Sequence, residues 1–392
     1  MDWEKAVKKE SKIFEIPSRW LHIHYFEALT ILFRIENALR VFVYSILKQN
    51  HFDKWADLSI QISDTETTTT IAALSRKRMN QVKMHGYLGY DISCPMMYLN
   101  SGEIIRLVTE TYWDQFHEFF KGSKDIIKNK LDEINTIRNS LAHFRPLKED
   151  DIEVLKQNAK HALLGVEKYL SDMVTTYHLV PTNTNDEWYI ALSTIGTELC
   201  TVSAFYDKSE QWIRIHITYA CPKLRLRKSD TSRIISTLNL NSDIILKRYN
   251  NITKFITYEC ETIPYMGSVK DVDSFNITKS GDMVFSSSVF KSKWTIIIED
   301  IKSVLSEISR ETDLIKNDNL ARGNLIEPVY LGCYSREGSS TWTINTDNLR
   351  CKSQEDSPTE YWESIEFGAD FISSSTNYPW TPSSVSDFEF PF

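Results

Sequence analysis

An arginine and a histidine stand five positions apart near the middle of the chain, at Arg138 and His143, and Asn139 follows the arginine directly. Histidine can donate and accept protons near neutral pH. Arginine can hold a phosphate group and stabilise the charge that develops on it. These residue types predict RNA cleavage without a metal ion, through attack of the 2′-hydroxyl on the neighbouring phosphate.

The spacing also constrains how these side chains can meet. At 3.6 residues per turn, Asn139 and His143 lie about 40° apart around a helix, whereas Arg138 and His143 lie about 140° apart. Arg138 could reach His143 only through its long side chain, or it could meet the histidine of a second copy. The alternative interpretation is an ordinary amphipathic helix that ends in a cationic cap.

Composition bounds the class of protein. A chain of 392 residues is long for one core and predicts two or three domains. It has no glycine-rich phosphate loop, no paired-cysteine zinc motif and no apolar leader or membrane-spanning run, so we expect a cytoplasmic protein that uses no metal, cofactor or membrane. Most of the net charge of −8 lies in residues 321–392, which leaves room for local basic patches elsewhere.

Residues 1–178 carry the periodicity of helices. The expected helices cover residues 24–48, 65–84, a segment that begins at a capping box of Asn100 and Glu103, residues 124–143 and a segment that begins near Glu149. In residues 124–143 the apolar stripe is formed by Ile127, Leu131, Ile134, Ile137 and Leu141. We therefore predict an all-α bundle followed by a strand-rich α+β domain, that is, a multidomain chain.

The bundle resembles the HEPN superfamily, many members of which are ribonucleases. The motif residues are Arg138, Asn139 and His143, within Leu131–Leu147. Two further segments are similar to a subfamily found in prokaryotic defence and abortive-infection proteins and fused to a eukaryotic mRNA quality-control endonuclease: Tyr98–Glu103 and Glu36–Arg40. The resemblance implies a homodimer in which two motif helices face one cleft, and a toxin or antiviral effector that cleaves RNA.

Other charged residues are weaker candidates for RNA binding. Glu133 could orient Arg138, or it could be an exposed helix charge. Arg145 lies beside the chemistry, and Arg76, Lys77 and Arg78 could follow an RNA backbone or simply form a solvated helix face.

The rest of the chain has a different pattern. Residues 179–187 are expected to be a linker, residues 188–320 an α+β domain of unknown role, and residues 321–392 an acidic, aromatic-rich tail of strands or partly disordered chain. Within the α+β domain we expect strands at 188–192, 212–217 and 294–298 and helices at 231–238 and 300–315. Residues 223–228 alternate cations with leucines, as an exposed strand does, and could bind phosphate.

The sequence therefore predicts an endoribonuclease whose partners are RNA, a second copy and a protein regulator or trigger that acts through the C-terminal half. The tail segment Trp362–Phe367 could cover the cleft and mimic the substrate's charge, or it could only complete the second domain. The alternative function is a non-catalytic HEPN module that binds nucleotides or RNA, or that mediates dimerisation.

Overall fold

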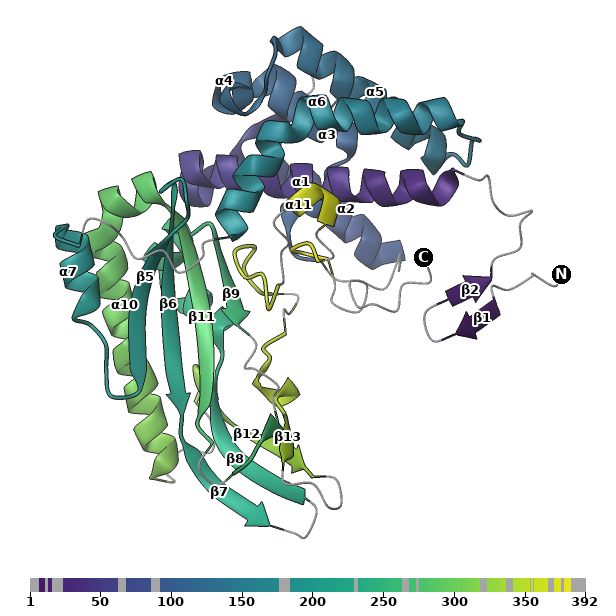
Figure 1. The fold of residues 1–392 in the computed structure, drawn as a ribbon. Coiled ribbons are helices and arrows are strands. Elements are labelled where there is room, and N and C mark those ends of the chain that lie inside the picture. The colour runs from purple at the N-terminus through teal and green to yellow at the C-terminus, as the bar shows by residue number, and fades with distance from the viewer. Residues whose placement is uncertain are drawn as a thin grey trace. The chain divides into compact units, whose positions relative to one another are not determined.

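The chain forms two compact units. In the computed structural model, the first unit comprises Met1–Thr175 with Glu366–Phe392, and the second comprises Thr176–Ile365 (Figure 1). The structure describes residues 7–10, 13–15, 24–62, 68–85, 92–175, 184–228, 232–262, 268–272, 275–317, 323–335, 341–352, 354, 356–365, 370–374 and 377–381. The predicted boundaries were residues 178, 187 and 320, and the predicted tail is divided between the two units.

Helix α1 (Tyr25–His51) is the centre of the first unit, because every residue from Asn37 to Lys48 is buried. The neighbouring long helices are α5 (Lys124–Ala142) and α6 (Glu149–Val174). The shorter helices are α2 (Ile71–His85), α3 (Ser101–Arg106), α4 (Trp113–Phe116) and α11 (Phe371–Ser374), with short 3₁₀-helical segments at Phe52–Asp57, Pro95–Tyr98 and His117–Phe119 and a π-helical segment at Leu107–Thr111.

Two sequence signals are confirmed in this unit. The buried residues of α5 are Ile127, Leu131, Ile134, Ile137 and Leu141, which is the predicted stripe. Asn100 caps α3 by accepting from the Glu103 amide, and the Glu103 carboxylate accepts from the Asn100 amide, at 2.9 Å each. Local sequence therefore fixes where α3 begins and which side of α5 is buried.

The prediction that the first domain is all-α is wrong. Two antiparallel hairpins belong to this unit: β1 (Val7–Glu10) pairs with β2 (Ile13–Glu15), and β3 (Ser59–Gln61) pairs with β4 (Thr68–Thr70). The helix expected from residue 65 begins only at Ile71, because three β-branched threonines precede it. Thr70 then caps α2 by accepting a hydrogen bond from the Ala73 amide at 3.1 Å.

The second unit contains two antiparallel sheets. The four-stranded sheet has the order β5 (Cys200–Tyr206), β6 (Trp212–Cys221), β11 (Ile277–Ser286) and β9 (Tyr258–Thr262). The five-stranded sheet has the order β10 (Ser268–Val269), β13 (Trp342–Asn345), β12 (Ile326–Tyr334), β8 (Ser232–Leu240) and β7 (Lys223–Lys228). The helices are α7 (Glu187–Ser193), α8 (Ser242–Arg248), α9 (Asn250–Phe255) and α10 (Ser287–Lys316), with a single turn at Asp347–Leu349. Helix α10 runs along the sheets, and Thr312 hydrogen bonds to Tyr219 of β6 at 2.9 Å (Figure 1).

Three predicted elements in the second unit are wrong. Residues 188–192 lie in α7 and residues 294–298 lie inside α10, whereas residues 232–240 form β8. The aromatic and branched side chains at these positions satisfy helical burial as well as a strand pattern, and tertiary packing decides between them. The strand expected at 212–217 and the helix expected at 300–315 are confirmed within β6 and α10.

The tail residues are integrated into both cores. Strands β12 and β13 join the five-stranded sheet, and Trp362 is buried with its ring stacked on Tyr258 at 4.0 Å between centroids. Trp362 is therefore not free to cover a cleft, and its role is to complete the second unit. Phe371 and Tyr378 are buried in the first unit, where the Tyr378 ring packs edge-on against Phe33.

Candidate active site

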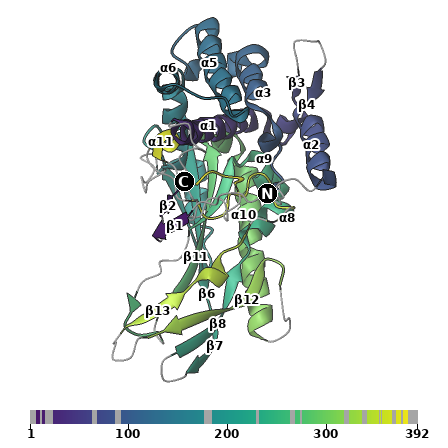
Figure 2. The ribbon, with the colours of Figure 1, turned by 90° about the vertical axis from the view of Figure 1, so that its right-hand side faces the viewer.

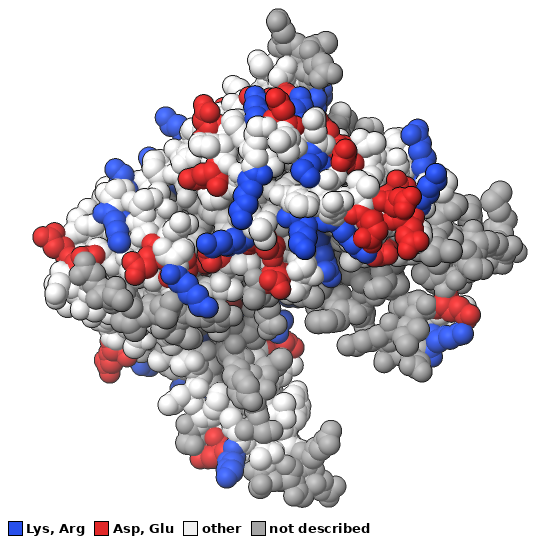
Figure 3. Space-filling view, turned by 45° about the horizontal axis from the view of Figure 1, so that its top comes forward, with Lys and Arg blue, Asp and Glu red and all other residues white. Residues whose placement is uncertain are grey.

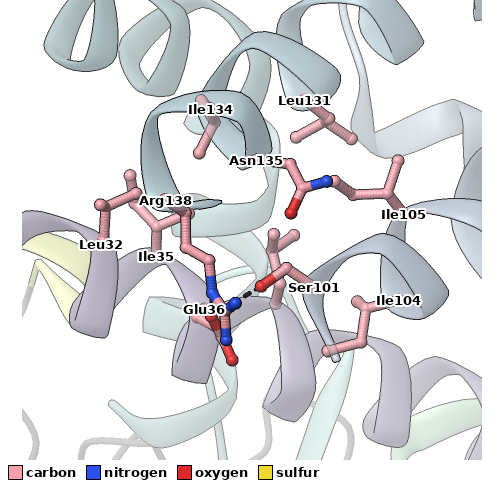
Figure 4. A pocket seen from close by; sticks show the side chains of 11 residues that line it. Leu32, Ile35, Glu36, Ser101, Ile104, Ile105, Leu131, Ile134, Asn135 and Arg138 are labelled. Carbon is pink, nitrogen blue, oxygen red and sulfur yellow. Dashed lines mark hydrogen bonds and ion pairs between the residues drawn. The ribbon is translucent and has the colours of Figure 1, made fainter. Parts of the chain in front are cut away.

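Arg138 lies on α5 and its guanidinium points toward α1 at a small pocket with a cavity volume of about 20 Å³ (Figure 4). The lining is mostly apolar, and its polar members are Glu36, Ser101, Asn135 and Arg138. The Arg138 side chain is 35% exposed, so the pocket holds one side of the group and leaves the other open to solvent.

Glu36 is the residue that holds Arg138. Its Oε2 accepts from Arg138 Nε at 3.3 Å and from the Ser101 hydroxyl at 2.6 Å, and its Oε1 forms an ion pair with Arg40 one turn along α1. Burial on its own would raise the pKa of Glu36, but the Arg40 charge, the Ser101 hydrogen bond and the Arg138 charge together lower that pKa. The carboxylate is thus ionised at neutral pH and shared by two arginines.

Arg40 is the buried member of this cluster. Besides Glu36, its guanidinium donates to the Leu99 carbonyl at 3.2 Å and to the Asn37 side chain at 3.3 Å. Burial lowers the pKa of Arg40, and the Glu36 charge opposes that shift. Arg40 therefore fixes Glu36 in place, while Arg138 lies at the solvent side of the same carboxylate.

Asn139 contacts Arg138, and His143 does not. The Asn139 side-chain oxygen accepts from Arg138 Nη1 at 3.4 Å, which is a long contact. His143 follows the last residue of α5 and is exposed, and its side chain forms no hydrogen bond or ion pair with any residue that the structure describes. Within one chain, the structure assembles two of the three motif residues.

The residue after His143 has an unusual backbone. Phe144 has a φ of 55°, a left-handed conformation that is rare for a bulky side chain. The turn is closed by the Arg145 amide, which donates to the Ser140 carbonyl at 2.9 Å. The Phe144 side chain is 79% exposed and its ring lies parallel to Tyr25, with 6.4 Å between centroids. No sequence signal pointed to this aromatic pair, of exposed Phe144 and half-buried Tyr25, beside His143.

The other sequence candidates are dispersed. Glu133 accepts a hydrogen bond from Asn158 of α6, so the acid that orients Arg138 is Glu36 and not Glu133. Arg78 forms a two-pronged ion pair with buried Glu103, at 2.6 and 2.7 Å, and is therefore occupied. Arg76, Lys77 and Arg145 are exposed. The cluster of Glu36, Arg40 and Arg138 could have been identified from one sequence signal. Glu36 and Arg40 are opposite charges four positions apart on the apolar stripe of α1.

Charges of both signs are interspersed on the face shown in Figure 3, so RNA binding there would depend on local groups. Among the described residues, no three His, Cys, Asp or Glu side chains are grouped as metal ligands. No helix in the described ranges is long and apolar enough to cross a membrane.

No protein-family model, curated protein or solved structure matches the chain.

Proposed function

We propose that this protein is a metal-independent endoribonuclease of the HEPN type. His143 would transfer the proton of the RNA 2′-hydroxyl or of the leaving oxygen, and Arg138 would stabilise negative charge on the phosphoryl oxygens. Attack of the 2′-oxygen on phosphorus would expel the 5′-oxygen of the next nucleotide, which takes up a proton. One product would end in a 2′,3′-cyclic phosphate and the other in a 5′-hydroxyl.

The observation that supports this function most directly is the charge balance around Glu36. One partly buried carboxylate faces two arginines, so the cluster has an excess of one positive charge. Glu36 engages Arg138 through Nε, and Nη1 makes only the long 3.4 Å contact with Asn139, so the terminal nitrogens of the partly exposed guanidinium keep N–H donors for a ligand. A planar pair of donors next to an uncompensated charge suits a phosphate group.

The exposed end of α5 supplies the other requirements. His143 is accessible to a substrate, and the parallel rings of Phe144 and Tyr25 give an unpaired base a surface on which to stack. Strained backbone at a bulky residue is most common at functional sites. Asn139, which touches Arg138, would help to position the phosphate.

A second copy would complete the site. Because Arg138 and His143 are about 140° apart around α5, we propose that Arg138 of one chain works with the histidine of its partner in a homodimer. The resemblance of the motif to defence proteins favours a toxin or abortive-infection effector in the cytoplasm, activated through the C-terminal half.

The decisive experiment measures cleavage of a labelled single-stranded RNA by the full chain in excess EDTA. We expect cleavage with 2′,3′-cyclic phosphate ends, and a loss of at least about a hundredfold in His143→Ala and in Arg138→Ala. His161→Ala, which removes an exposed histidine from α6, is the matched control and should retain the wild-type rate.

Two results would contradict the proposal. If EDTA abolishes cleavage and magnesium restores it, the mechanism is different. If the wild type binds RNA but leaves it intact at every concentration that forms dimers, the module is a non-catalytic binding protein. The separation of His143 from Arg138 within one chain would then be the reason why it does not cleave.

Mixing inactive His143→Ala with inactive Arg138→Ala should restore part of the activity, because the mixed dimer retains one complete site.

A further inference from the structure

The five-stranded sheet of the second unit has one covered and one open face. Ile235, Leu331, Cys333 and Ile344 are buried on one side. On the other side Ile234, Tyr330 and Tyr334 are 43%, 58% and 60% exposed. Neighbouring residues of a strand point to opposite faces, so the open side is a continuous surface across β7, β8 and β12, which lie next to one another in Figure 2.

Strand register places two arginines beside the tyrosines. Arg225 pairs with Ser236, which pairs with Tyr330 on the next strand. Arg227 pairs with Ile234, which pairs with Gly332. Side chains of directly paired residues lie on the same face. The arginines are therefore two strands, or roughly 10 Å, from the tyrosine strand.

Gly332 determines how the second tyrosine lies. A Cβ atom at Gly332 would be 2.7 Å from the Tyr334 hydroxyl oxygen and 3.0 Å from two of its ring carbons. The Tyr334 ring therefore lies over Gly332, against the sheet, in space that any larger residue would occupy. One side of the ring contacts the strand, and the other is presented to solvent.

The charges of this surface are of one sign. Arg225 and Arg227 are exposed, and neither forms an ion pair with a carboxylate of the described residues. No aspartate or glutamate lies at the paired positions of this face. These positions fall within Arg225–Arg227 of β7, Ser232–Ser236 of β8, Tyr330–Tyr334 of β12 and Thr343–Asn345 of β13. In a chain with a net charge of −8, such a surface favours an anionic ligand.

We propose that this face binds single-stranded RNA, with bases stacked on Tyr330 and Tyr334 and phosphates held by Arg225 and Arg227. Aromatic rings on an open sheet beside unpaired arginines match the needs of unstacked bases on a charged backbone. Thr343 and Asn345, on the strand next to the tyrosines, offer hydrogen bonds to the 2′-hydroxyl that distinguishes RNA from DNA. This site is separate from Arg138 and His143 and does not depend on cleavage.

The test is fluorescence anisotropy with the full-length His143→Ala chain and a labelled single-stranded RNA of about 12 nucleotides. Tyr330→Ala and Tyr334→Ala should each weaken binding at least about fivefold, the lower end of the loss expected for one stacked base. The double substitution Arg225→Ala with Arg227→Ala should reduce the slope of log affinity against log salt by about 1.4, because two phosphate contacts are lost.

Matched controls separate this site from general effects. Tyr330→Phe and Tyr334→Phe keep the rings and should bind within about twofold of the parent chain. Lys302→Ala with Lys316→Ala removes the same charge from the exposed side of α10 and should leave the salt slope unchanged. Binding to RNA that is insensitive to both tyrosines and both arginines would overturn the proposal. So would equal affinity for duplex RNA, tighter binding of DNA of the same sequence, or no RNA binding at all.

Discussion

Replacing Glu36 by glutamine tests whether the cluster beneath Arg138 is organised as described. The substitution keeps the shape of the side chain and removes the charge that Arg40 and Arg138 share. The Arg40 side chain is 11% exposed, so its charge would remain buried without a counter-ion. We expect the first unit to lose stability and Arg138 to lose its fixed orientation.

The magnitude follows from the burial of each pair. Leaving one partner of a buried ion pair uncompensated costs about 3–5 kcal/mol. The Arg138 pair is more exposed and adds at most about 1 kcal/mol after solvent screening. For a unit of this size, in which 1 kcal/mol shifts Tm by roughly 2–4 °C, the sum of about 3–6 kcal/mol corresponds to a decrease in Tm of roughly 6–24 °C. Arg138→Ala, in contrast, should decrease Tm only slightly while it abolishes cleavage.

Thermal unfolding followed by circular dichroism measures these shifts. Glu110→Gln is the matched control, because Glu110 forms a 2.6 Å pair with Lys128 in which both side chains are partly exposed, and it should cost less than about 1 kcal/mol. Since the pKa of Glu36 is lowered in the fold, its contribution is fully present above about pH 4.5 and is lost as the pH falls through the folded value. The difference between wild type and Glu36→Gln should therefore narrow below about pH 4. Equal shifts for Glu36→Gln and Glu110→Gln would refute the reasoning.

Two further predictions concern other buried groups. Burial, together with the nearby charges of Glu261 and Asp243, raises the pKa of Glu259 well above its ordinary value, so the free energy of unfolding should fall as the pH rises above about 4.3. In denaturant titrations between pH 5 and 8, the free energy of unfolding of Glu259→Gln should rise relative to that of the wild type by up to about 1.4 kcal/mol per pH unit. A difference between the two proteins that does not change with pH would contradict this. Phe371→Ala should destabilise the first unit by about 3–5 kcal/mol, because Phe371 is fully buried there, whereas Leu164→Ala on the exposed side of α6 should cost little; equal effects would mean that the tail does not stabilise this unit.

The sequence predicts those parts of the fold that depend on local chemistry. The stripe of α5 repeats at the helical period, and the Asn100–Glu103 box fixes the start of α3 through two side-chain hydrogen bonds. Both signals act within a few residues, so they survive whatever the rest of the chain does. The same holds for β7, whose alternating cations and leucines form an exposed edge strand.

The sequence misleads where long-range packing decides between two local possibilities. Ile296, Ile297 and Ile298 favour a strand by propensity, yet they lie in α10, where Ile297, Ile298 and Ile301 are buried at helical spacing. Ser232–Leu240 becomes a strand because β7 and β12 pair with it on both sides. Strand β7 directly precedes this segment, but β12 cannot be identified as its other partner from local sequence, since β12 lies almost a hundred residues further along the chain.

The candidate site divides in the same way. A motif on one helix identifies Arg138 and His143, but a helix places them about 140° apart. The motif alone therefore does not predict which residues of other helices contact each side chain. What Arg138 faces is Glu36, on a helix about a hundred residues earlier, and that acid is itself fixed by Arg40 and Ser101. The chemistry of the arginine is thus set by α1 and α3, while His143 is left exposed at the end of α5. Within one chain Arg138 is anchored by Glu36, whereas His143 has no polar side-chain partner among the described residues. The proposed pairing of Arg138 with the histidine of a second copy is therefore what the experiment with mixed His143→Ala and Arg138→Ala chains tests.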